Sequence, residues 1–219
     1  MPWIPSHARK TPATLVSKTM PRLTLFLALL VATAAVLAQD NRDSERQRRA
    51  EGQKAEDIRD LTRRMSRQTG QANVPDEALL IHSKVSLLLK RAEQAAAGSY
   101  LFRQLEDAMD DLLDGSEDII ESREEDRDPD EDDQQDSARF LERAFFRVRQ
   151  GDYFAGLSKE RDGGEYVELA RRLYQQARAA YDAAEYRRAE RLAAAAMEVI
   201  EGLENLAEAA VPIPDPPRL

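Results

Sequence analysis

The stretch GGEYVELARRLYQQARAAYDAAEYRRAERLAAAAMEVIEGLENLAEAA, residues 163–210, decides the fold of this chain. Apolar and small side chains recur in it at intervals of three and four residues, in two runs separated by residues 182–185. That interval places them along one face of an α-helix, so the stretch predicts two amphipathic helices joined by a short turn. The predicted faces comprise Tyr166, Leu169, Ala170, Leu173, Ala177 and Tyr181 in the first helix, and Tyr186, Ala189, Leu192, Ala193, Ala196, Ile200, Leu203, Leu206 and Ala210 in the second.

A similar pair of runs lies upstream, over residues 79–121. Pro75 and the two acidic residues after it are typical of a helix start, and Gly98-Ser99 interrupts the apolar pattern. A second helical hairpin is therefore predicted here. Its apolar positions are Ala78, Ile81, Val85, Leu88, Leu89, Ala92 and Ala95 before the interruption, and Leu101, Leu105, Ala108, Leu112 and Ile119 after it.

The two predicted hairpins share a short pattern at an offset of 87 residues. DGSEDII at 114–120 parallels EGLENLA at 201–207, and Leu105 and Ala108 correspond to Leu192 and Ala195. One interpretation is the duplication of a helical hairpin. The other is that amphipathic helices rich in Leu and Ala resemble one another by chance, and the sequence leaves both open.

Three further segments surround the hairpins. Residues 41–68 carry both charge signs and a thin apolar stripe, which predicts a solvated helix. The segment 121–137 holds ten acidic and no apolar residues, which predicts a loop. A phenylalanine-rich helix is expected after it, beginning at Asp136 or Ser137 and ending at Gly151.

No run in the chain alternates with the period of two that strands require. The predicted fold class is therefore all-α, with antiparallel helical hairpins packed as a bundle. Residues 211–219, VPIPDPPRL, contain four prolines and are expected to form an extended tail. The predicted organisation is a signal peptide over 1–38, a charged N-terminal helix over 39–73, a helical bundle over 74–210 with an acidic loop over 121–137, and a proline-rich tail over 211–219.

The N-terminal region has the features of a signal peptide. Residues 23–38, LTLFLALLVATAAVLA, form an apolar run that follows Arg22 and is shorter than the roughly 20 residues needed to cross a bilayer. Val36 and Ala38 are small side chains at the positions that signal peptidase reads. We therefore expect cleavage after Ala38, a periplasmic or extracellular location, and no membrane span afterwards. The alternative is an uncleaved anchor, and Met1 and Met20 are both compatible translation starts.

The composition excludes several classes of function. Residues 1–38 hold four basic and no acidic residues, so their removal changes the formal charge from −9 to −13, which disfavours nucleic-acid binding. The chain has no cysteine, and His82 is the one histidine after residue 38. Disulfides, thiolate chemistry and a zinc or haem site are therefore not expected, and no cofactor is predicted. We interpret His82 as an interface histidine.

Residues 173–196 resemble a tetratricopeptide-type helical hairpin. With Tyr186 between the two helices, Ala177, Ala189 and Ala196 occupy three of the small-residue positions at which the two helices of that family approach closely. Glu201 stands where the family has its closing proline, and no tandem repeat of 34 residues follows. The resemblance implies peptide or protein binding on a concave face.

Acidic residues supply the candidate metal ligands. Asp126, Asp128, Asp130 and Asp132 alternate along the acidic loop, as aspartates do in calcium loops. The glycine and the final glutamate of an EF-hand are missing, so a solvated polyanion is the preferred interpretation. The acidic residues between Glu106 and Glu121 are expected to form a solvated helix face, because they lie opposite the apolar positions.

Aromatic residues concentrate in the second half of the chain. Most are expected to form core, because aromatic side chains at helical spacing usually pack inward. The alternative is that Phe146, Tyr153 and Phe154, near the end of the phenylalanine-rich helix, form an exposed anchor for a protein partner.

The sequence thus favours a non-catalytic interaction or scaffold protein of the cell envelope, with a protein partner and no nucleic acid. The alternative is a module that binds divalent cations or cationic ligands through residues 124–136. An enzyme is not expected, because no catalytic motif with the required spacing is present.

Overall fold

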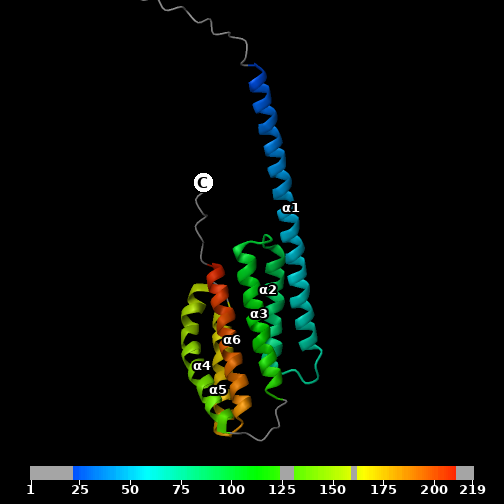
Figure 1. Ribbon diagram of the computed structural model, residues 1–219. Helices are drawn as coiled ribbons and strands as arrows, with labels where there is room; N and C mark the ends of the chain where they lie inside the picture. The colour runs from blue at the N-terminus through cyan, green and yellow to red at the C-terminus, as the bar shows by residue number, and fades with distance from the viewer. Residues whose placement is uncertain (1–21, 124–130, 159–161, 211–219) are drawn as a thin grey trace, which may run out of the picture. The chain divides into compact units, whose positions relative to one another are not determined.

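The computed structural model describes residues 22–123, 131–158 and 162–210, with side chains from Ser44 onward except those of residues 131 and 132. Six helices occupy these ranges and no strand occurs within them, so the predicted all-α class is confirmed (Figure 1). No helix in the described ranges is long and apolar enough to span a membrane. The helices are α1 (Arg22–Thr69), α2 (Asp76–Gln94), α3 (Tyr100–Glu121), α4 (Glu131–Ser158), α5 (Gly163–Asp182) and α6 (Tyr186–Ala210).

The chain divides into two compact units, Met1–Arg48 and Arg49–Leu219. In the first unit, the described residues belong to the N-terminal part of α1, and the predicted cleavage position after Ala38 falls within that helix. Residues 1–21 of the predicted leader lie outside the described ranges, as does the proline-rich tail. The second unit contains the rest of α1 and helices α2 to α6, and it holds the sites considered below.

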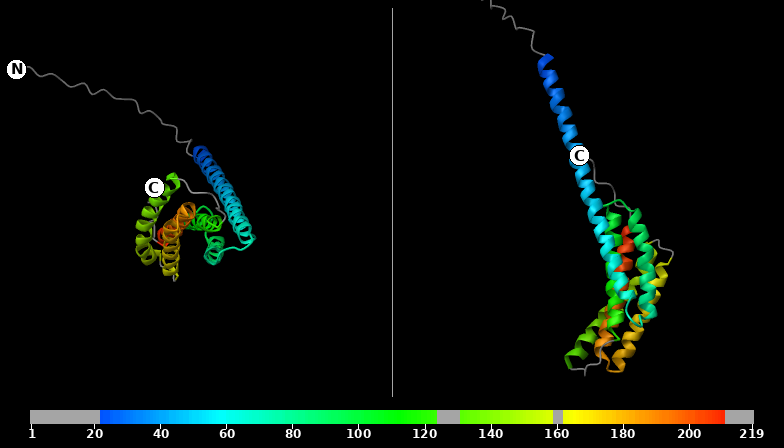
Figure 2. Two further views of the ribbon diagram at one scale, coloured as in Figure 1. Left: turned by 90° about the horizontal axis from the view of Figure 1, so that it is seen from below. Right: turned by 90° about the vertical axis from the view of Figure 1, so that its right-hand side faces the viewer.

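Within the second unit, α3 and α6 form the centre of a helical bundle. They run antiparallel, because Tyr100 at the start of α3 contacts Glu208 near the end of α6, while Arg191 near the start of α6 contacts Asp118 near the end of α3. Helix α2 packs on α3, and both α4 and α5 pack on α6 (Figures 1 and 2). The largest fully buried side chains are Ile81, Leu105, Met109, Leu112, Leu113, Leu169, Leu173, Ile200, Leu203 and Leu206, most of them from the predicted helix faces.

The turns of both hairpins lie where the sequence predicts them. Gly98 adopts a φ of +69°, which favours glycine, and the Ser99 hydroxyl accepts a hydrogen bond from the Phe102 amide at 3.1 Å. Between α5 and α6, Ala184 takes a φ of +63° and the chain reverses over residues 183–185. The three alanines of the tetratricopeptide-like pattern are fully buried in this hairpin.

Two glycines allow α3 and α6 to approach closely. A Cβ atom on Gly115 would lie 3.3 Å from the Ala195 carbonyl oxygen. A Cβ atom on Gly202 would lie 3.1 Å from the Ala108 carbonyl oxygen and 3.1 Å from Leu112 Cγ. A larger side chain at either position would push the two central helices apart.

These contacts are reciprocal at the offset of 87 residues. Gly115 corresponds to Gly202, and Ala108 corresponds to Ala195. Gly115 faces Ala195 and Gly202 faces Ala108, so the two contacts are equivalent under this offset. The acids of two charged contacts share this offset: Arg64 binds Asp114 and Glu117, while Arg147, 83 residues after Arg64, binds Glu201 and Glu204. This arrangement supports the duplication interpretation for α3 and α6.

The structure corrects the predicted boundaries of the bundle at its N-terminal side. The bundle was predicted to begin at residue 74, after the charged helix. In the structure the compact unit includes this helix from residue 49 onward, and Leu61 on it is buried. Gln68 is also buried and donates a hydrogen bond to the Leu113 carbonyl oxygen at 3.0 Å. The thin apolar stripe is thus supplemented by polar groups that satisfy backbone acceptors of the neighbouring helices.

The phenylalanine-rich helix is longer than predicted at both ends. It begins at Glu131 rather than Asp136 or Ser137, so the C-terminal part of the predicted acidic loop is helical. Acidic residues in a first turn interact favourably with the helix dipole, which offsets their lack of apolar partners. Gly151 does not end the helix: it is buried, and a Cβ atom there would lie 2.8 Å from Ile200 Cδ1.

Replacing Lys54 by methionine is expected to lower the free energy of unfolding by about 1.5 kcal/mol. Lys54 is buried, and its Nζ donates to the carbonyl oxygens of Glu93 at 2.8 Å and Ala95 at 2.6 Å, at the C-terminus of α2. Methionine keeps the packing of the stem but leaves these carbonyl groups without the charged donor. Urea denaturation measures the loss, and the exposed Lys90→Met variant is the control; equal stability of the two variants would contradict the capping role.

Candidate functional site

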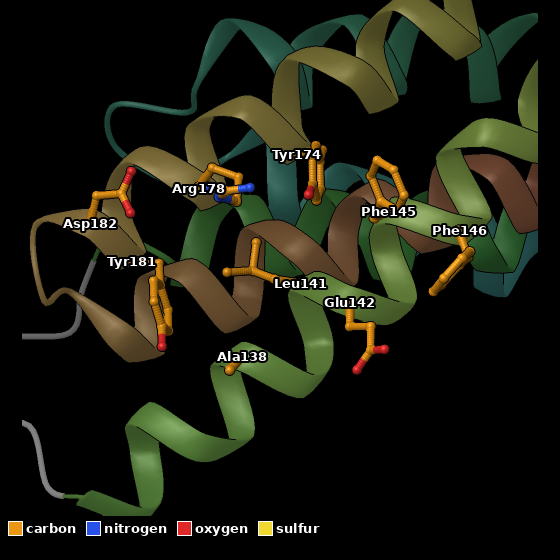
Figure 3. Close-up of a pocket in the computed structure, with 9 residues that line it drawn as sticks. All are labelled: Ala138, Leu141, Glu142, Phe145, Phe146, Tyr174, Arg178, Tyr181 and Asp182. Carbon is orange, nitrogen blue, oxygen red and sulfur yellow. The ribbon is translucent and has the colours of Figure 1, made fainter.

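An aromatic groove lies between α4 and α5. It encloses about 450 Å³ and draws on the N-terminal half of α4 and the C-terminal half of α5 (Figure 3). Leu141 is buried at its base, while Phe145 is 40% exposed. The residues that line the groove are Ala138, Leu141, Glu142, Phe145, Phe146, Tyr174, Arg178, Tyr181 and Asp182.

The rings of the groove contact one another across the two helices. Phe145 extends toward Tyr174 of α5, with ring centroids 6.1 Å apart, whereas Phe146 points away from α5 (Figure 3). The Phe145 and Phe146 rings meet edge to face at 5.5 Å. Arg178 hydrogen-bonds to the Tyr174 side chain, an interaction that raises the pKa of the guanidinium. The groove therefore offers apolar ring faces with charged groups along its edges.

A stripe of exposed apolar side chains continues along α4 from this groove. Phe146 is 59% exposed, Tyr153 67% and Leu157 40%. Their spacing of seven and four residues places them on one face of the helix. Three large apolar side chains left in solvent on one helix face are typical of a surface that binds a partner. We call these three residues the α4 stripe.

The three residues predicted as a partner anchor thus divide into two groups. Phe146 and Tyr153 are exposed, but Phe154 is half-buried and packs against the core, with the Arg147 guanidinium 5.5 Å from its ring centroid. Leu157 belongs to the exposed surface and was not predicted from the sequence. Its spacing of four from Tyr153 was the available signal, but the expected end of the helix at Gly151 concealed it.

A cluster of acidic side chains lies where α3 and α6 meet. Carboxylate oxygens of Asp111, Glu198 and Glu201 lie within 4.8 Å of one another. Asn205 donates a hydrogen bond to Asp111 at 2.7 Å. Asp107, Asp110, Asp114 and Glu117 are exposed, as expected for a solvated face, but Asp111 is half-buried.

Burial weakens two of these carboxylic acids, those of Glu198 and Asp111. Desolvation, followed by repulsion from neighbouring carboxylates, raises the pKa of Glu198 to about 7. Desolvation also raises the pKa of Asp111 to about 7, against the opposing effect of the Asn205 hydrogen bond. Such a group can take up protons near neutral pH, and three carboxylates at this separation are also chemically able to contact a divalent cation.

His82 joins three helices through its side chain. Its Nε2 lies 3.1 Å from Gln68 Oε1 on α1 and 2.8 Å from Ser116 Oγ on α3. The ring is buried, and desolvation lowers its pKa. The interpretation of His82 as an interface histidine is confirmed.

The predicted cation ligands belong to the acidic segment before and at the start of α4. Asp126, Asp128 and Asp130 lie outside the described residues, and the side chain of Asp132 does so too. The part of the acidic segment that is described contributes Asp133, which accepts a hydrogen bond from Arg187 at 3.1 Å. Cation binding by this segment stays a prediction.

Comparison with known proteins found no match for this chain among protein-family models, curated proteins or solved structures. The resemblance of residues 173–196 to a tetratricopeptide-type hairpin therefore stays a prediction.

Proposed function

We propose that this chain is a non-catalytic interaction protein of the cell envelope and that the α4 stripe contacts its protein partner. The observation that carries the proposal is the exposure of Phe146, Tyr153 and Leu157 on one face of α4. Aromatic side chains on a rigid helix bury much area at small cost in conformational entropy, which is why they dominate protein interfaces.

Three further features support the proposal. The acidic charge of the chain after residue 38 disfavours nucleic acid, and the signal-peptide pattern of residues 1–38 favours a location outside the cytoplasm. Ala144 and Val148, on the opposite face of α4 from the stripe, are buried, so packing against the bundle holds this helix in place. The stripe is therefore held in one orientation, as a preorganised interface requires.

A photo-reactive amino acid at position 153, introduced in the native host, tests the proposal. We expect one discrete cross-linked adduct in the envelope fraction, with the mass of a chain that lacks residues 1–38 plus that of the partner. Phe146→Ser in the same chain is expected to reduce the adduct about fivefold or more, because it removes a neighbouring anchor.

The matched control carries the photo-reactive amino acid at Leu87. This α2 side chain is 54% exposed and lies on the other hairpin. The same adduct at both positions, or no adduct at position 153, would overturn the assignment of the surface. An adduct whose mass retains residues 1–38 would instead overturn the processing and leave the surface intact.

A further inference from the structure

We propose that the protein partner of the α4 stripe is an amphipathic helix that carries carboxylates on both sides of its apolar face. The inference rests on the proposed function, because it specifies the chemistry of the partner that contacts Phe146, Tyr153 and Leu157. Two exposed arginines beside this stripe, Arg143 and Arg149, carry the argument.

The surface of α4 is basic in a chain that is strongly acidic. Residues 139–150, RFLERAFFRVRQ, contain four arginines and one glutamate, a local charge of +3, whereas the formal charge of residues 39–219 is −13. Interfaces pair a positive patch with a negative one. The charge of this face therefore favours an acidic partner, and it distinguishes the face from the chain as a whole.

Arg143 and Arg149 lie on opposite sides of the stripe. Each is three residues from Phe146, and three residues turn an α-helix by about 300°, so the two side chains leave α4 about 60° to either side of Phe146. By the same measure, Tyr153 and Leu157 lie within about 20° of Phe146, which itself points away from α5 (Figure 3). The surface is therefore an apolar strip with one guanidinium group along each edge.

Aromatic rings of α4 hold both guanidinium groups. The Arg143 Cζ atom lies 4.2 Å from the Phe140 ring centroid, and the Arg149 Cζ atom lies 5.5 Å from the Phe145 ring centroid. Phe140 packs against the core, and the Phe145 ring contacts Tyr174 of α5. A guanidinium group that is already held over a ring loses little conformational entropy when a carboxylate binds to it.

Neither of these arginines has an ion pair with a carboxylate in the part of the chain that the structure describes. By contrast, Arg139, Arg147 and Arg171 each contact an acidic side chain. The N–H donors of Arg143 and Arg149 are therefore available to carboxylates of a partner. A planar guanidinium group binds a carboxylate through two parallel hydrogen bonds, which adds specificity to the charge.

The shape of the surface fits a helix. When two helices pack side by side, a narrow apolar seam lies between them and charged side chains flank it, where opposite charges select the partner and its orientation. The stripe extends over 11 residues from Phe146 to Leu157, about 16 Å, which corresponds to three turns of a partner helix. Carboxylates on that helix, next to its apolar positions, would lie opposite the two arginines.

Two other occupants fit the charges less well. Two α4 helices from two copies of this chain would bring the same arginines together around Phe146, and like charges that meet at an interface are unfavourable. An anionic bilayer would attract Arg143 and Arg149 but repel the acidic chain, and Glu142 and Asp152 are also exposed on α4. Charge complementarity therefore favours an acidic helix of a different protein.

Photo-crosslinking in the native host, with the photo-reactive amino acid at position 153, tests the inference. The test variant combines Arg143→Gln with Arg149→Gln. We expect it to reduce the yield of the partner adduct about tenfold, because it removes both charges and leaves the apolar stripe intact. Replacing both arginines by lysine keeps the charges, so that variant is expected to stay within about twofold of the original yield.

The matched control combines Arg63→Gln with Arg188→Gln. These exposed arginines lie on α1 and α6, and their replacement changes the formal charge of the chain by the same amount. We expect the adduct yield of this variant to change by less than about twofold. Thermal unfolding of the purified variants checks that the bundle is intact in each. Equal losses of adduct in the test and control variants would overturn the inference.

Mass spectrometry of the cross-linked peptide supplies a second readout. The expected peptide comes from a different protein, has apolar residues at intervals of three and four, and contains more acidic than basic residues. A neutral or basic peptide, a peptide of this chain, or an adduct yield that Arg143→Gln with Arg149→Gln leaves unchanged would overturn the inference and leave the proposed function standing. A lipid adduct, or no adduct at position 153, would overturn the proposed function as well.

Discussion

Replacing Gly202 by leucine is expected to lower the free energy of unfolding by about 4 kcal/mol, which is near the upper end of the range for single substitutions. The position lies where α6 is closest to α3, and even a Cβ atom would be 3.1 Å from the Ala108 carbonyl oxygen. Because that atom belongs to the backbone of a packed helix, it cannot move aside by rotation of a side chain. The leucine therefore has to separate the two central helices.

Gly156→Leu is the matched control for this prediction. Gly156 also lies inside a helix, but no atom lies within 4 Å of the Cβ that would be added. Leucine is a better helix former than glycine, so this variant is expected to be more stable by about 0.5–1 kcal/mol. Chemical denaturation of both variants gives the comparison. A small loss at position 202, similar in size to the change at position 156, would show that the helices can separate at little cost.

The sequence was sufficient to predict the helices, because their apolar side chains repeat at the helical interval over many turns. The break at Gly98-Ser99 and the reversal at residues 182–185 were predictable for the same reason: local chemistry decides them. Gly151 was misinterpreted because glycine has two uses. Its backbone freedom ends helices, and its lack of a side chain allows close packing. Only the presence of Ile200 against it distinguishes the two.

The candidate site was less predictable than the fold. Whether an aromatic residue on α4 is exposed depends on which neighbouring helix covers it, and periodicity does not supply that information. Phe154 and Tyr153 are adjacent in sequence, yet one packs against the core and the other is exposed. The acidic residues of α3 show the same limit, because a carboxylate such as Asp111 becomes half-buried only when α6 is placed against it.

The double substitution Asp111→Asn with Glu198→Gln is expected to stabilise the bundle by about 3 kcal/mol at pH 8. The two pKa values, raised from 3.8 and 4.5 to about 7, would together correspond to about 8 kcal/mol in a dry interior. Both groups are only half-buried, and solvent screening therefore reduces the expected gain to less than half. The amide at position 111 retains an oxygen that can accept the hydrogen bond from Asn205.

The pH dependence of this gain distinguishes relief of repulsion from improved packing. A carboxyl group whose pKa is raised by folding contributes stability that is fully present below its unfolded pKa, near 4, and is lost as the pH rises through about 7. The advantage of the double variant should therefore fall from about 3 kcal/mol at pH 8 to about 1 kcal/mol at pH 5. His82, whose pKa is lowered, makes the opposite contribution below pH 6.5 in both proteins, so it cancels from the difference.

Thermal or urea unfolding at the two pH values measures the gain, with the exposed Glu142→Gln variant as the control. A gain that is the same at pH 5 and pH 8 would mean that the amides improve packing and that the carboxylates do not oppose the contact between α3 and α6.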